Sequence, residues 1–303
     1  MNQRRSCFAG LPRDDVPATW PPLRFEPHCR RLQGMKHAVF RFDAQLARLL
    51  PSRFPENPRI CCFSGPQSVK HLVEAFGIPH TELRRVDVRG APVGLDYLVA
   101  DGDRLNVLGI TEEPSTVEPK FVLDGHLGRL NASLRMLGFD CVYERAPADV
   151  KLAEISSAEH RILLTRDRRL LMRKAVSHGY LVRSQNPASQ LAELVNRFSL
   201  LAWMRPFCRC ILCNGVLLPV EKQKVENRLE PLTRLYYDNF RLCPTCGQVF
   251  WPGSHLARMR RVIEDLRQRP KGACLPSLRK ANGQIGDSDA RGGALLGENC
   301  RRQ

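Results

Sequence analysis

Short apolar segments alternate with helical patterns over residues 120–200, and this alternation restricts the fold more than any other feature of the chain. The expected strands cover Lys120–Leu123, Phe139–Tyr143, Arg161–Thr165 and Tyr180–Arg183. The expected helices cover Leu127–Leu137, Asp149–Ser157, Arg168–His178 and Pro187–Leu200. Short strands that alternate with helices of about ten residues form βαβ units. We therefore expect an α/β domain with a mainly parallel sheet.

Two aspartates follow strands of this predicted sheet. Asp124 comes directly after Phe121-Val122-Leu123, and Asp167 comes two residues after Thr165. In a parallel sheet both acids lie at the carboxyl ends of the strands, where ligands bind. Neighbouring carboxylates repel each other unless a cation lies between them, and their hard oxygen ligands suit Mg²⁺ or Mn²⁺. Such an ion activates a bound water, so this pattern in a basic chain favours a metal-dependent nuclease.

A third acid would complete the site, and two residues are candidates. Asp149 begins a predicted helix after the second strand, whereas Asp140 stands at the start of that strand. We favour Asp149 because it lies on the carboxyl-end side of the sheet. Capping of the helix explains an aspartate at this position equally well.

Basic and aromatic residues near these acids are candidates for nucleic-acid contact. A guanidinium offers two parallel donors to a phosphate, and an aromatic ring can stack on an unpaired base. Solvated arginines and a packed tryptophan are the alternatives. The candidates are Arg129, Arg166, Arg168, Trp251 and His255, the last two beside a basic helix expected at Leu256–Arg269.

Two CxxC pairs predict a metal centre downstream of the α/β pattern. They are Cys210 with Cys213 and Cys243 with Cys246, and strand signals at Val216–Val220 and Leu235–Phe240 lie between them. Four thiolates on two knuckles form a closed, structural Zn²⁺ site. Cys208 is a competing ligand with a less usual spacing.

The cysteines also indicate the cellular compartment of the protein. The chain has 12 cysteines, and its first residues lack the apolar segment of a signal peptide. Paired CxxC knuckles favour metal binding in a reducing compartment, so we expect a cytoplasmic protein. No apolar run approaches the ~20 residues of a membrane span, and no membrane association is expected.

The segment before the α/β pattern predicts a small α+β module. A strand is expected at His37–Phe42, and helices at Ala44–Leu50 and Ser68–Phe76. Ser68 is a good N-cap, and Gly77 can end the second helix with a positive φ. Further strands are expected at Arg85–Val88 and Arg104–Leu108.

Charge and composition complete the expected organisation. The formal net charge of +16 and the pI near 9.7 indicate a polyanionic partner, although the two ends of the chain carry more than half of this excess. We expect no packed structure in residues 1–35, where Met35 is a candidate start. The expected parts are an α+β module at 36–112, a linker at 113–119, the α/β domain at 120–205, a zinc unit at 206–255, and a basic helix and disordered tail at 256–303.

Residues Lys120–His255 resemble the Mut-seven carboxy-terminal RNase family, a branch of the PIN-like nucleases. The matching motifs are FVLDGHLGRLNASLRMLGFD, RILLTRDRRL and the knuckles around Cys210 and Cys243. The resemblance implies a PIN-like fold with a zinc ribbon. It also implies metal-ligand roles for Asp124 and Asp167, the intervening acidic position for Asp149 and a basic catalytic position for Arg129. Where the family commonly has paired acids, this chain has Ala148-Asp149, one acid fewer.

The preceding segment resembles ubiquitin-like β-grasp domains of the ThiS/MoaD type, and bacterial members of the RNase family carry such a domain at this position. The matching sequences are FRF, VKHLVEAFGIPHTEL and DGDRLNVL. Sulfur carriers end in an exposed Gly-Gly, whereas here Gly109-Ile110-Thr111 continues into more protein. A carrier role is therefore disfavoured, and an accessory or substrate-presenting domain is expected. A protein partner of this domain is possible and is not identified by the sequence.

The sequence thus favours a ribonuclease that uses Mg²⁺ or Mn²⁺, held by Asp124, Asp149 and Asp167, to hydrolyse single-stranded RNA with water as the nucleophile. A second hypothesis is a non-catalytic RNA-binding or adaptor protein that uses the ribbon and the basic tail. The single acid at Asp149 supports this alternative.

Overall fold

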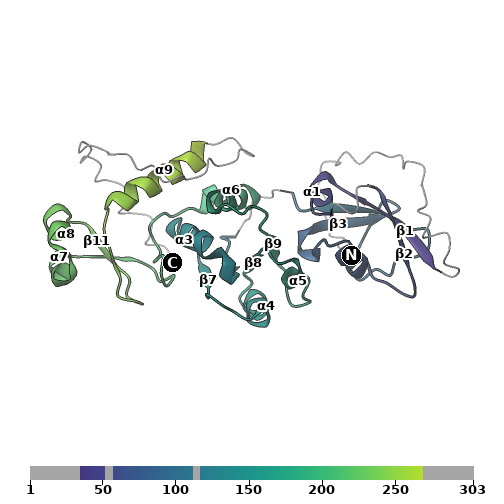
Figure 1. The fold of residues 1–303 in the computed structure, drawn as a ribbon, viewed down its shortest axis with the longest axis horizontal. Coiled ribbons are helices and arrows are strands. Elements are labelled where there is room, and N and C mark those ends of the chain that lie inside the picture. The colour runs from purple at the N-terminus through teal and green to yellow at the C-terminus, as the bar shows by residue number, and fades with distance from the viewer. Residues whose placement is uncertain (1–34, 52–56, 112–116, 269–303) are drawn as a thin grey trace, which may run out of the picture.

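The computed structural model describes residues 35–51, 57–111 and 117–268, which form an elongated molecule with three units arranged along its length (Figure 1). The β-grasp sheet lies at one end, the parallel sheet in the middle and the ribbon at the other end. The predictions for the leader, for most of the linker and for the tail lie outside the described residues. The predicted fold class, a PIN-like α/β domain between a β-grasp module and a zinc ribbon, is confirmed.

The N-terminal unit is a mixed sheet with the strand order β2-β1-β5-β3-β4. Its central strands β1 and β5 are parallel, and the other neighbours are antiparallel. Helices α1 and α2 and the short helix η2 complete it. The bounds are β1 Lys36–Phe42, α1 Ala44–Ala47, β2 Arg59–Phe63, α2 Val69–Ala75, η2 His80–Glu82, β3 Leu83–Val88, β4 Ala91–Val93 and β5 Arg104–Gly109.

The predicted boundaries of α2 are confirmed. The Ser68 hydroxyl accepts a hydrogen bond from the His71 N–H at 3.2 Å, which satisfies one of the donors that a helix start leaves open. At the other end Gly77 has a φ of 85°, a conformation that glycine adopts without steric cost. Helix α1 is shorter than predicted and ends at Ala47.

The central unit is a parallel sheet with the strand order β7-β6-β8-β9. Its strands are short, and each is followed by a helix, as the alternation predicts. The bounds are β6 Phe121–Leu123, η3 Gly125–Leu127, α3 Gly128–Met136, β7 Cys141–Tyr143, α4 Asp149–Ala158, β8 Ile162–Thr165, α5 Arg168–Leu171, β9 Gly179–Leu181, α6 Pro187–Arg197 and η4 Leu200–Trp203.

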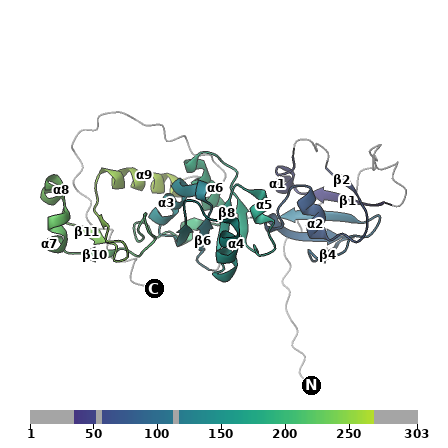
Figure 2. The ribbon, with the colours of Figure 1, turned by 60° about the horizontal axis from the view of Figure 1, so that its bottom comes forward.

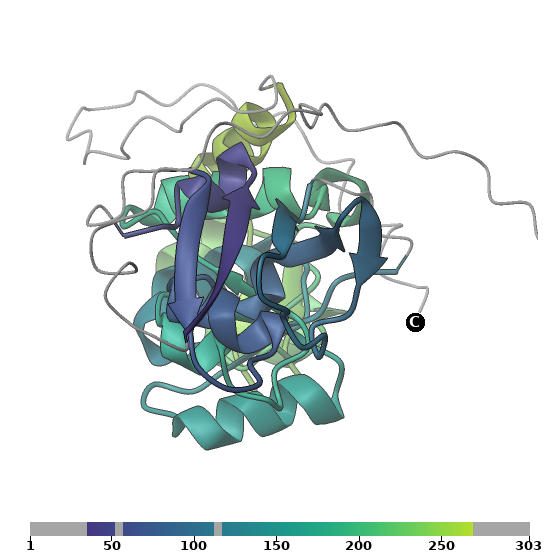
Figure 3. The ribbon, with the colours of Figure 1, turned by 90° about the vertical axis from the view of Figure 1, so that its right-hand side faces the viewer.

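Helices cover both faces of this sheet. One core joins Phe121, Leu123 and Leu164 to the apolar residues of α3 and α6. The alternate strand residues Val122 and Leu163 face α4 and α5 instead, and this second core continues without a break into the β-grasp unit. Viewed from the β-grasp end, the β-grasp unit lies in front of the parallel-sheet unit (Figure 3). The two units therefore share one hydrophobic core.

Helix α5 is four residues long, so the prediction of a helix over Arg168–His178 is wrong. After Leu171 the chain bends, and Val176 turns into the core shared with the β-grasp unit. The Val176 carbonyl lies 2.8 Å from Nε2 of His80 in that unit. A contact with a distant part of the chain thus replaces the helical hydrogen bonding that the local sequence favours.

The C-terminal unit is a small antiparallel sheet with the strand order β10-β11-β12, followed by a longer helix. The strand predicted at Leu235–Phe240 is wrong, because Leu235 belongs to helix α8 and the strand begins at Phe240. Ile263 of the last helix, α9, is buried against the core of α3 and α6 (Figure 2). The bounds are β10 Leu218–Val220, α7 Lys222–Val225, η5 Glu226–Arg228, α8 Pro231–Tyr236, β11 Phe240–Leu242, β12 Val249–Phe250 and α9 Ser254–Gln268.

Among the described residues no helix combines the length and the apolar character that a membrane crossing requires.

Candidate functional site

Asp124 and Asp167 lie at the carboxyl edge of the parallel sheet and are linked through Thr165. Asp124 follows β6, and its Oδ2 accepts a hydrogen bond from the Thr165 hydroxyl at 2.8 Å. The same hydroxyl oxygen accepts a hydrogen bond from the Asp167 N–H at 2.9 Å. Thr165 is fully buried at the end of β8, so its side chain is held in place by the sheet. The pairing of β6 with β8 therefore brings the two acids to one edge.

Asp167 is also the N-cap of helix α5. Its Oδ1 accepts a hydrogen bond from the Arg169 N–H at 2.8 Å, and the residue is exposed. A capping carboxylate uses one oxygen for the helix and can offer the other to a ligand. The cap fixes the direction of the Asp167 side chain relative to Asp124.

Asp149 is the first residue of α4, and it does not cap that helix. Ala148 occupies the N-cap position, and Asp149 lies 3.6 Å from the guanidinium of Arg173. About half of each side chain is exposed, at 51% for Asp149 and 41% for Arg173. Arg173 follows α5, so this ion pair joins the start of α4 to the segment that carries Asp167.

The three aspartates do not form a compact cluster. In the part of the chain that the structure describes, the four knuckle cysteines are the only group of three or more acids, histidines or cysteines whose ligand atoms all lie close enough for one ion. Asp124 and Asp167 are brought together through Thr165, and Asp149 is held to the side by Arg173.

Close backbone approaches explain two glycines of the DGHLG motif. A Cβ at Gly125 would lie 2.5 Å from the carbonyl oxygen of Arg145, and one at Gly128 would lie 2.7 Å from the hydroxyl of Tyr143. The Tyr143 hydroxyl donates a hydrogen bond to the Gly125 carbonyl at 2.9 Å. These contacts hold the loop after Asp124 against the end of β7.

The predicted basic residues occupy different environments. Arg129 and Arg166 are exposed near the carboxyl edge. Arg168 instead donates through Nη1 to the carbonyls of Leu49 and Gly77, at 2.6 and 2.8 Å, in the β-grasp unit. The side chain that was expected to contact nucleic acid is thus used to join two parts of the protein.

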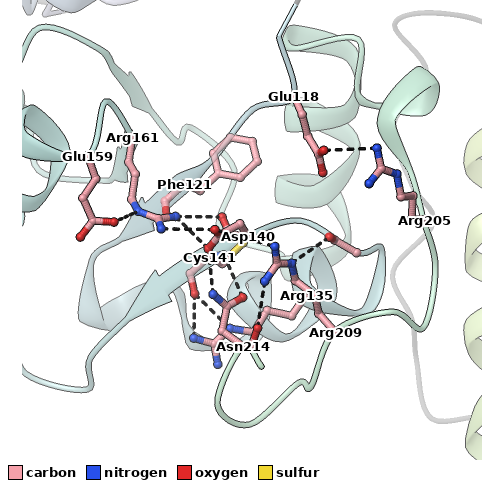
Figure 4. Close-up of polar contacts among 11 residues, drawn as sticks. Glu118, Phe121, Arg135, Asp140, Cys141, Glu159, Arg161, Arg205, Arg209 and Asn214 are labelled. Atoms are coloured by element: carbon pink, nitrogen blue, oxygen red, sulfur yellow. Dashed lines mark hydrogen bonds and ion pairs between the residues drawn. The ribbon is translucent and has the colours of Figure 1, made fainter. Parts of the chain in front are cut away.

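Asp140, the alternative third acid, lies at the opposite edge of the sheet. Its carboxylate accepts hydrogen bonds from Arg161 at 2.9 and 3.3 Å and from the Asn214 amide at 2.8 Å (Figure 4). Burial acts to raise the pKa of Asp140, but these hydrogen bonds and the nearby charges of Arg161 and Arg209 lower it below its usual value. This aspartate connects the sheet to the ribbon and does not face the Asp124 edge.

The first knuckle is also the point where the ribbon contacts this amino edge. The Asn214 side-chain oxygen accepts a hydrogen bond from the Cys141 N–H at 3.0 Å. Arg135 of α3 donates to the carbonyls of Leu212, at 2.7 Å, and Cys141, at 2.8 Å (Figure 4). The ribbon and the aspartate pair therefore lie at opposite ends of the parallel strands.

The four knuckle cysteines converge as the spacing predicts. The sulfurs of Cys210, Cys213, Cys243 and Cys246 all lie within 4.8 Å of one another. A Cβ at Gly215 would lie 2.6 Å from Thr245 Oγ1 and 2.9 Å from Cys243 Sγ, so the glycine lets the two knuckles meet. Cys208 is not part of the group. Four sulfurs in this arrangement can hold a metal ion and suit Zn²⁺.

Burial raises the pKa of Cys210 to about 12. Burial also acts to raise the pKa of Cys243, but the N–H groups of Cys246 and Thr245 and the thiol of Cys213 lower it to about 7. Since a thiol must lose its proton to bind a metal, the affinity of this site depends on pH.

The two residues predicted to stack on or contact a base lie after the second knuckle. Trp251 is 40% exposed, and its ring lies against Gly253. His255 belongs to the first turn of α9, where the structure describes no side chains.

Comparison with known families gives two matches. Residues 119–263 match the Mut7-C RNAse domain, and residues 35–114 match the Mut7-C ubiquitin domain. The chain combines these two Mut7-C domains. Neither the curated proteins nor the solved structures that were compared with the chain gave a match.

Residues 119–263 are thus similar to a domain that is named for nuclease activity. The matched range includes the ribbon and reaches into α9 as well as covering the parallel sheet. The knuckles are thus part of the same family unit as Asp124 and Asp167.

Two residues of the candidate site were not predicted from the sequence. Thr165 links the two aspartates. The sequence pattern that could have identified it is a hydroxyl residue at the end of a buried strand, two positions before an acid. Arg173 pairs with Asp149. No local sequence pattern identifies it, because it follows α5 in a segment where the sequence predicts a longer helix.

Proposed function

We propose that the protein is a ribonuclease that depends on a divalent cation and hydrolyses single-stranded RNA. The observation that carries the proposal is the hydrogen-bonded unit of Asp124, Thr165 and Asp167 at the carboxyl edge of a sheet in a nuclease-family domain. The net charge of +16 favours a polyanionic substrate.

The donor set fits Mg²⁺ or Mn²⁺. Asp124 uses Oδ2 for Thr165 and Asp167 uses Oδ1 for Arg169, and no other hydrogen bond from the described residues reaches either carboxylate. Each acid therefore has an oxygen to offer, and carboxylate oxygens are the ligands that these cations prefer. When bound, such an ion activates water and neutralises charge on the phosphate.

The protein residues have separate tasks in this proposal. Thr165 orients the Asp124 carboxylate, and the α5 cap orients Asp167. Asp149, which now pairs with Arg173, would serve as a third ligand for the cation. Arg129 and Arg166, exposed near the same edge, bind substrate phosphates.

Replacement of Asp124 by Asn tests the proposal. The amide keeps the shape and the hydrogen bond to Thr165 but removes a charged ligand. Residues that only hydrogen-bond to metal ligands typically change metal affinity or activity by about 10–100-fold when they are replaced. Loss of a ligand itself should have a larger effect. We therefore expect Asp124→Asn and Asp167→Asn to reduce cleavage of single-stranded RNA in Mn²⁺ by at least ~100-fold. The measurement is the initial rate on labelled RNA, with Mn²⁺ affinity determined by calorimetry.

Asp238→Asn is the matched control, because this carboxylate is exposed in the ribbon and pairs with Lys222. It should cleave at the wild-type rate. Wild-type rates in Asp124→Asn and Asp167→Asn would show that these acids do not carry the reaction.

A non-catalytic RNA-binding or adaptor role is the second candidate. The observation in its favour is that Asp149 pairs with Arg173 and that the three acids do not form a compact group. RNA binding that persists in EDTA, together with no cleavage in Mn²⁺, would support this candidate over the ribonuclease.

We also propose that the four cysteines hold a structural Zn²⁺ and that the chain divides into a β-grasp domain at 36–112, a nuclease domain at 120–205 and a ribbon at 206–255. A carrier role for the β-grasp domain has little support. The Gly109 N–H donates to Asp43, and the Thr111 carbonyl accepts a hydrogen bond from Arg197, so contacts within the protein hold the segment that a carrier exposes.

A further inference from the structure

The β-grasp unit covers the free edge of strand β9. This strand is the last in the order β7-β6-β8-β9, so one row of its backbone donors points away from the sheet. The Leu181 N–H donates to Oε1 of Glu82 at 2.8 Å, and Arg183 lies 3.2 Å from the other carboxylate oxygen. Glu82 is only 3% exposed. A β-grasp side chain thus takes the place of a neighbouring strand.

A second contact of the same kind begins at Arg168, the residue after Asp167. Its Nη1 donates to the carbonyls of Leu49 and Gly77, which follow helices α1 and α2. Carbonyls at helix ends lack intrahelical donors, and a guanidinium satisfies them well. One nitrogen of Arg168 therefore joins the start of α5 to the ends of two β-grasp helices.

Between these two contacts the chain is held by packing. Leu170, Leu171 and Val176 are completely buried in the core that the two units share. The Val176 carbonyl lies 2.8 Å from His80 Nε2, and His80 Nδ1 lies 2.7 Å from Glu74. The β-grasp unit thus contacts residues 168–183 at both ends and in the middle.

The same segment also carries groups of the candidate functional site. Asp167 caps α5 immediately before Arg168, and Arg173 pairs with Asp149. We infer that the β-grasp domain fixes the Asp167 segment, with Arg168 as the positioning residue. This role rests on the proposed function only where it concerns metal binding and cleavage, because the contacts themselves do not depend on it.

Replacement of Arg168 tests the inference. Arg168→Met keeps the aliphatic part of the side chain and removes the nitrogen that donates both hydrogen bonds. Arg168→Lys keeps the charge and one nitrogen on a shorter side chain, so it should retain only part of the contact with the two carbonyls. Arg169→Met is the matched control, since it removes an equal charge from an exposed side chain one residue along the same helix.

Hydrogen–deuterium exchange of the peptide covering residues 169–176 in the full-length protein is the first measurement. We expect about tenfold faster exchange in Arg168→Met, a smaller increase in Arg168→Lys and no change in Arg169→Met. Equal exchange in Arg168→Met and Arg169→Met would overturn the inference. If Arg168→Met does not fold, the comparison of Arg168→Lys with wild type decides instead, and unchanged exchange overturns the inference.

Metal affinity and kinetics form the second measurement. A displaced Asp167 should weaken Mn²⁺ binding by about tenfold and lower kcat, with little change in KM for RNA and partial rescue by lysine. Unchanged Mn²⁺ affinity and kcat in an Arg168→Met protein with faster exchange would overturn the positioning of the site. Absence of Mn²⁺ binding and cleavage in the wild type would instead contradict the proposed function, and the exchange result would still decide whether Arg168 fixes the segment.

Discussion

The two ends of the parallel sheet use aspartate in opposite ways. At the amino end, Asp140 accepts hydrogen bonds from Arg161 and Asn214 and has Arg209 3.8 Å away. At the carboxyl end, the carboxylates of Asp124 and Asp167 each accept one hydrogen bond from the described residues, from the Thr165 hydroxyl and the Arg169 N–H. A carboxylate whose oxygens are all occupied connects parts of a fold, whereas one with an unused oxygen can bind a cation.

The two ends of the sheet also differ in how far other parts of the protein cover them. The ribbon covers the amino end through Asn214 and the carbonyls that accept from Arg135. At the carboxyl end, Arg166 and Asp167 are exposed among the residues that the structure describes. The comparison predicts that changes at the amino end affect stability and that changes at the carboxyl end affect metal binding and cleavage.

The largest expected effect comes from loss of the ribbon's metal. Structural zinc contributes on the order of 10 kcal/mol in small zinc domains, so Cys213→Ser should unfold the ribbon. Because Asn214 follows Cys213 and bonds to Asp140, the amino end should lose protection as well. The measurements are zinc content per chain and hydrogen exchange of residues 206–255 and 139–143.

Cys61→Ser is the control, since this cysteine lies in the β-grasp strand β2 and is not a knuckle residue. Its zinc content should match that of the wild type. A Cys213→Ser protein that retains wild-type zinc content and ribbon protection would contradict the four-cysteine site.

The next largest effect comes from replacing an aspartate by alanine at each end of the parallel sheet. Asp140→Ala removes one of the two carboxylates that pair with Arg161, whose side chain is 9% exposed, and leaves only Glu159. Breaking a buried ion pair in this way should cost about 3 kcal/mol. The melting temperature should fall by roughly 6–12 °C. Asp149→Ala at the carboxyl end should change stability by less than about 0.5 kcal/mol, because that side chain is half exposed.

The pH dependence of this difference provides the internal control. The folded pKa of Asp140 is lowered from 3.8, so its stabilisation is fully present above that ordinary value and is lost as the pH falls through the folded pKa. Urea unfolding of wild type and Asp140→Ala should therefore converge only in strong acid. A difference in stability that grows as the pH falls below 3.8 would show that the Asp140 contacts do not lower its pKa.

Local patterns were sufficient to predict the features that depend on neighbouring residues. The alternation of strands and helices predicts the parallel sheet, and this order alone puts Asp124 and Asp167 at one edge. The spacing of the knuckles likewise predicts the four-sulfur group, because two CxxC loops can meet only if the chain between them folds back.

Contacts between distant residues could not be predicted in this way. Arg168 and Arg166 have the same local context, yet only Arg168 bonds to carbonyls 119 and 91 residues earlier in the chain. The end of α5 depends on where Val176 meets the β-grasp core, and periodicity does not encode that. Asp140 remained a candidate ligand for the same reason, since its partner Asn214 lies 74 residues away.

The smallest expected effect concerns the link inside the site itself. Thr165→Val removes the hydroxyl that donates to Asp124 and accepts from the Asp167 N–H, with little change in shape. We expect a loss of about 1 kcal/mol in stability and about tenfold in kcat, because the Asp167 N–H loses its acceptor and Asp124 loses the group that orients it. Chemical denaturation and RNA cleavage in Mn²⁺ measure the two effects.

Thr165→Ser is the informative partner of this variant, because it keeps the hydroxyl and removes the methyl group. If the hydroxyl orients Asp124, serine should retain most of the activity while losing stability through the small cavity that it leaves. Equal cleavage by the valine and serine variants would mean that Asp124 needs no orientation by Thr165. The carboxyl end would then differ from the amino end only in the unused oxygens of its acids, and not in how they are held.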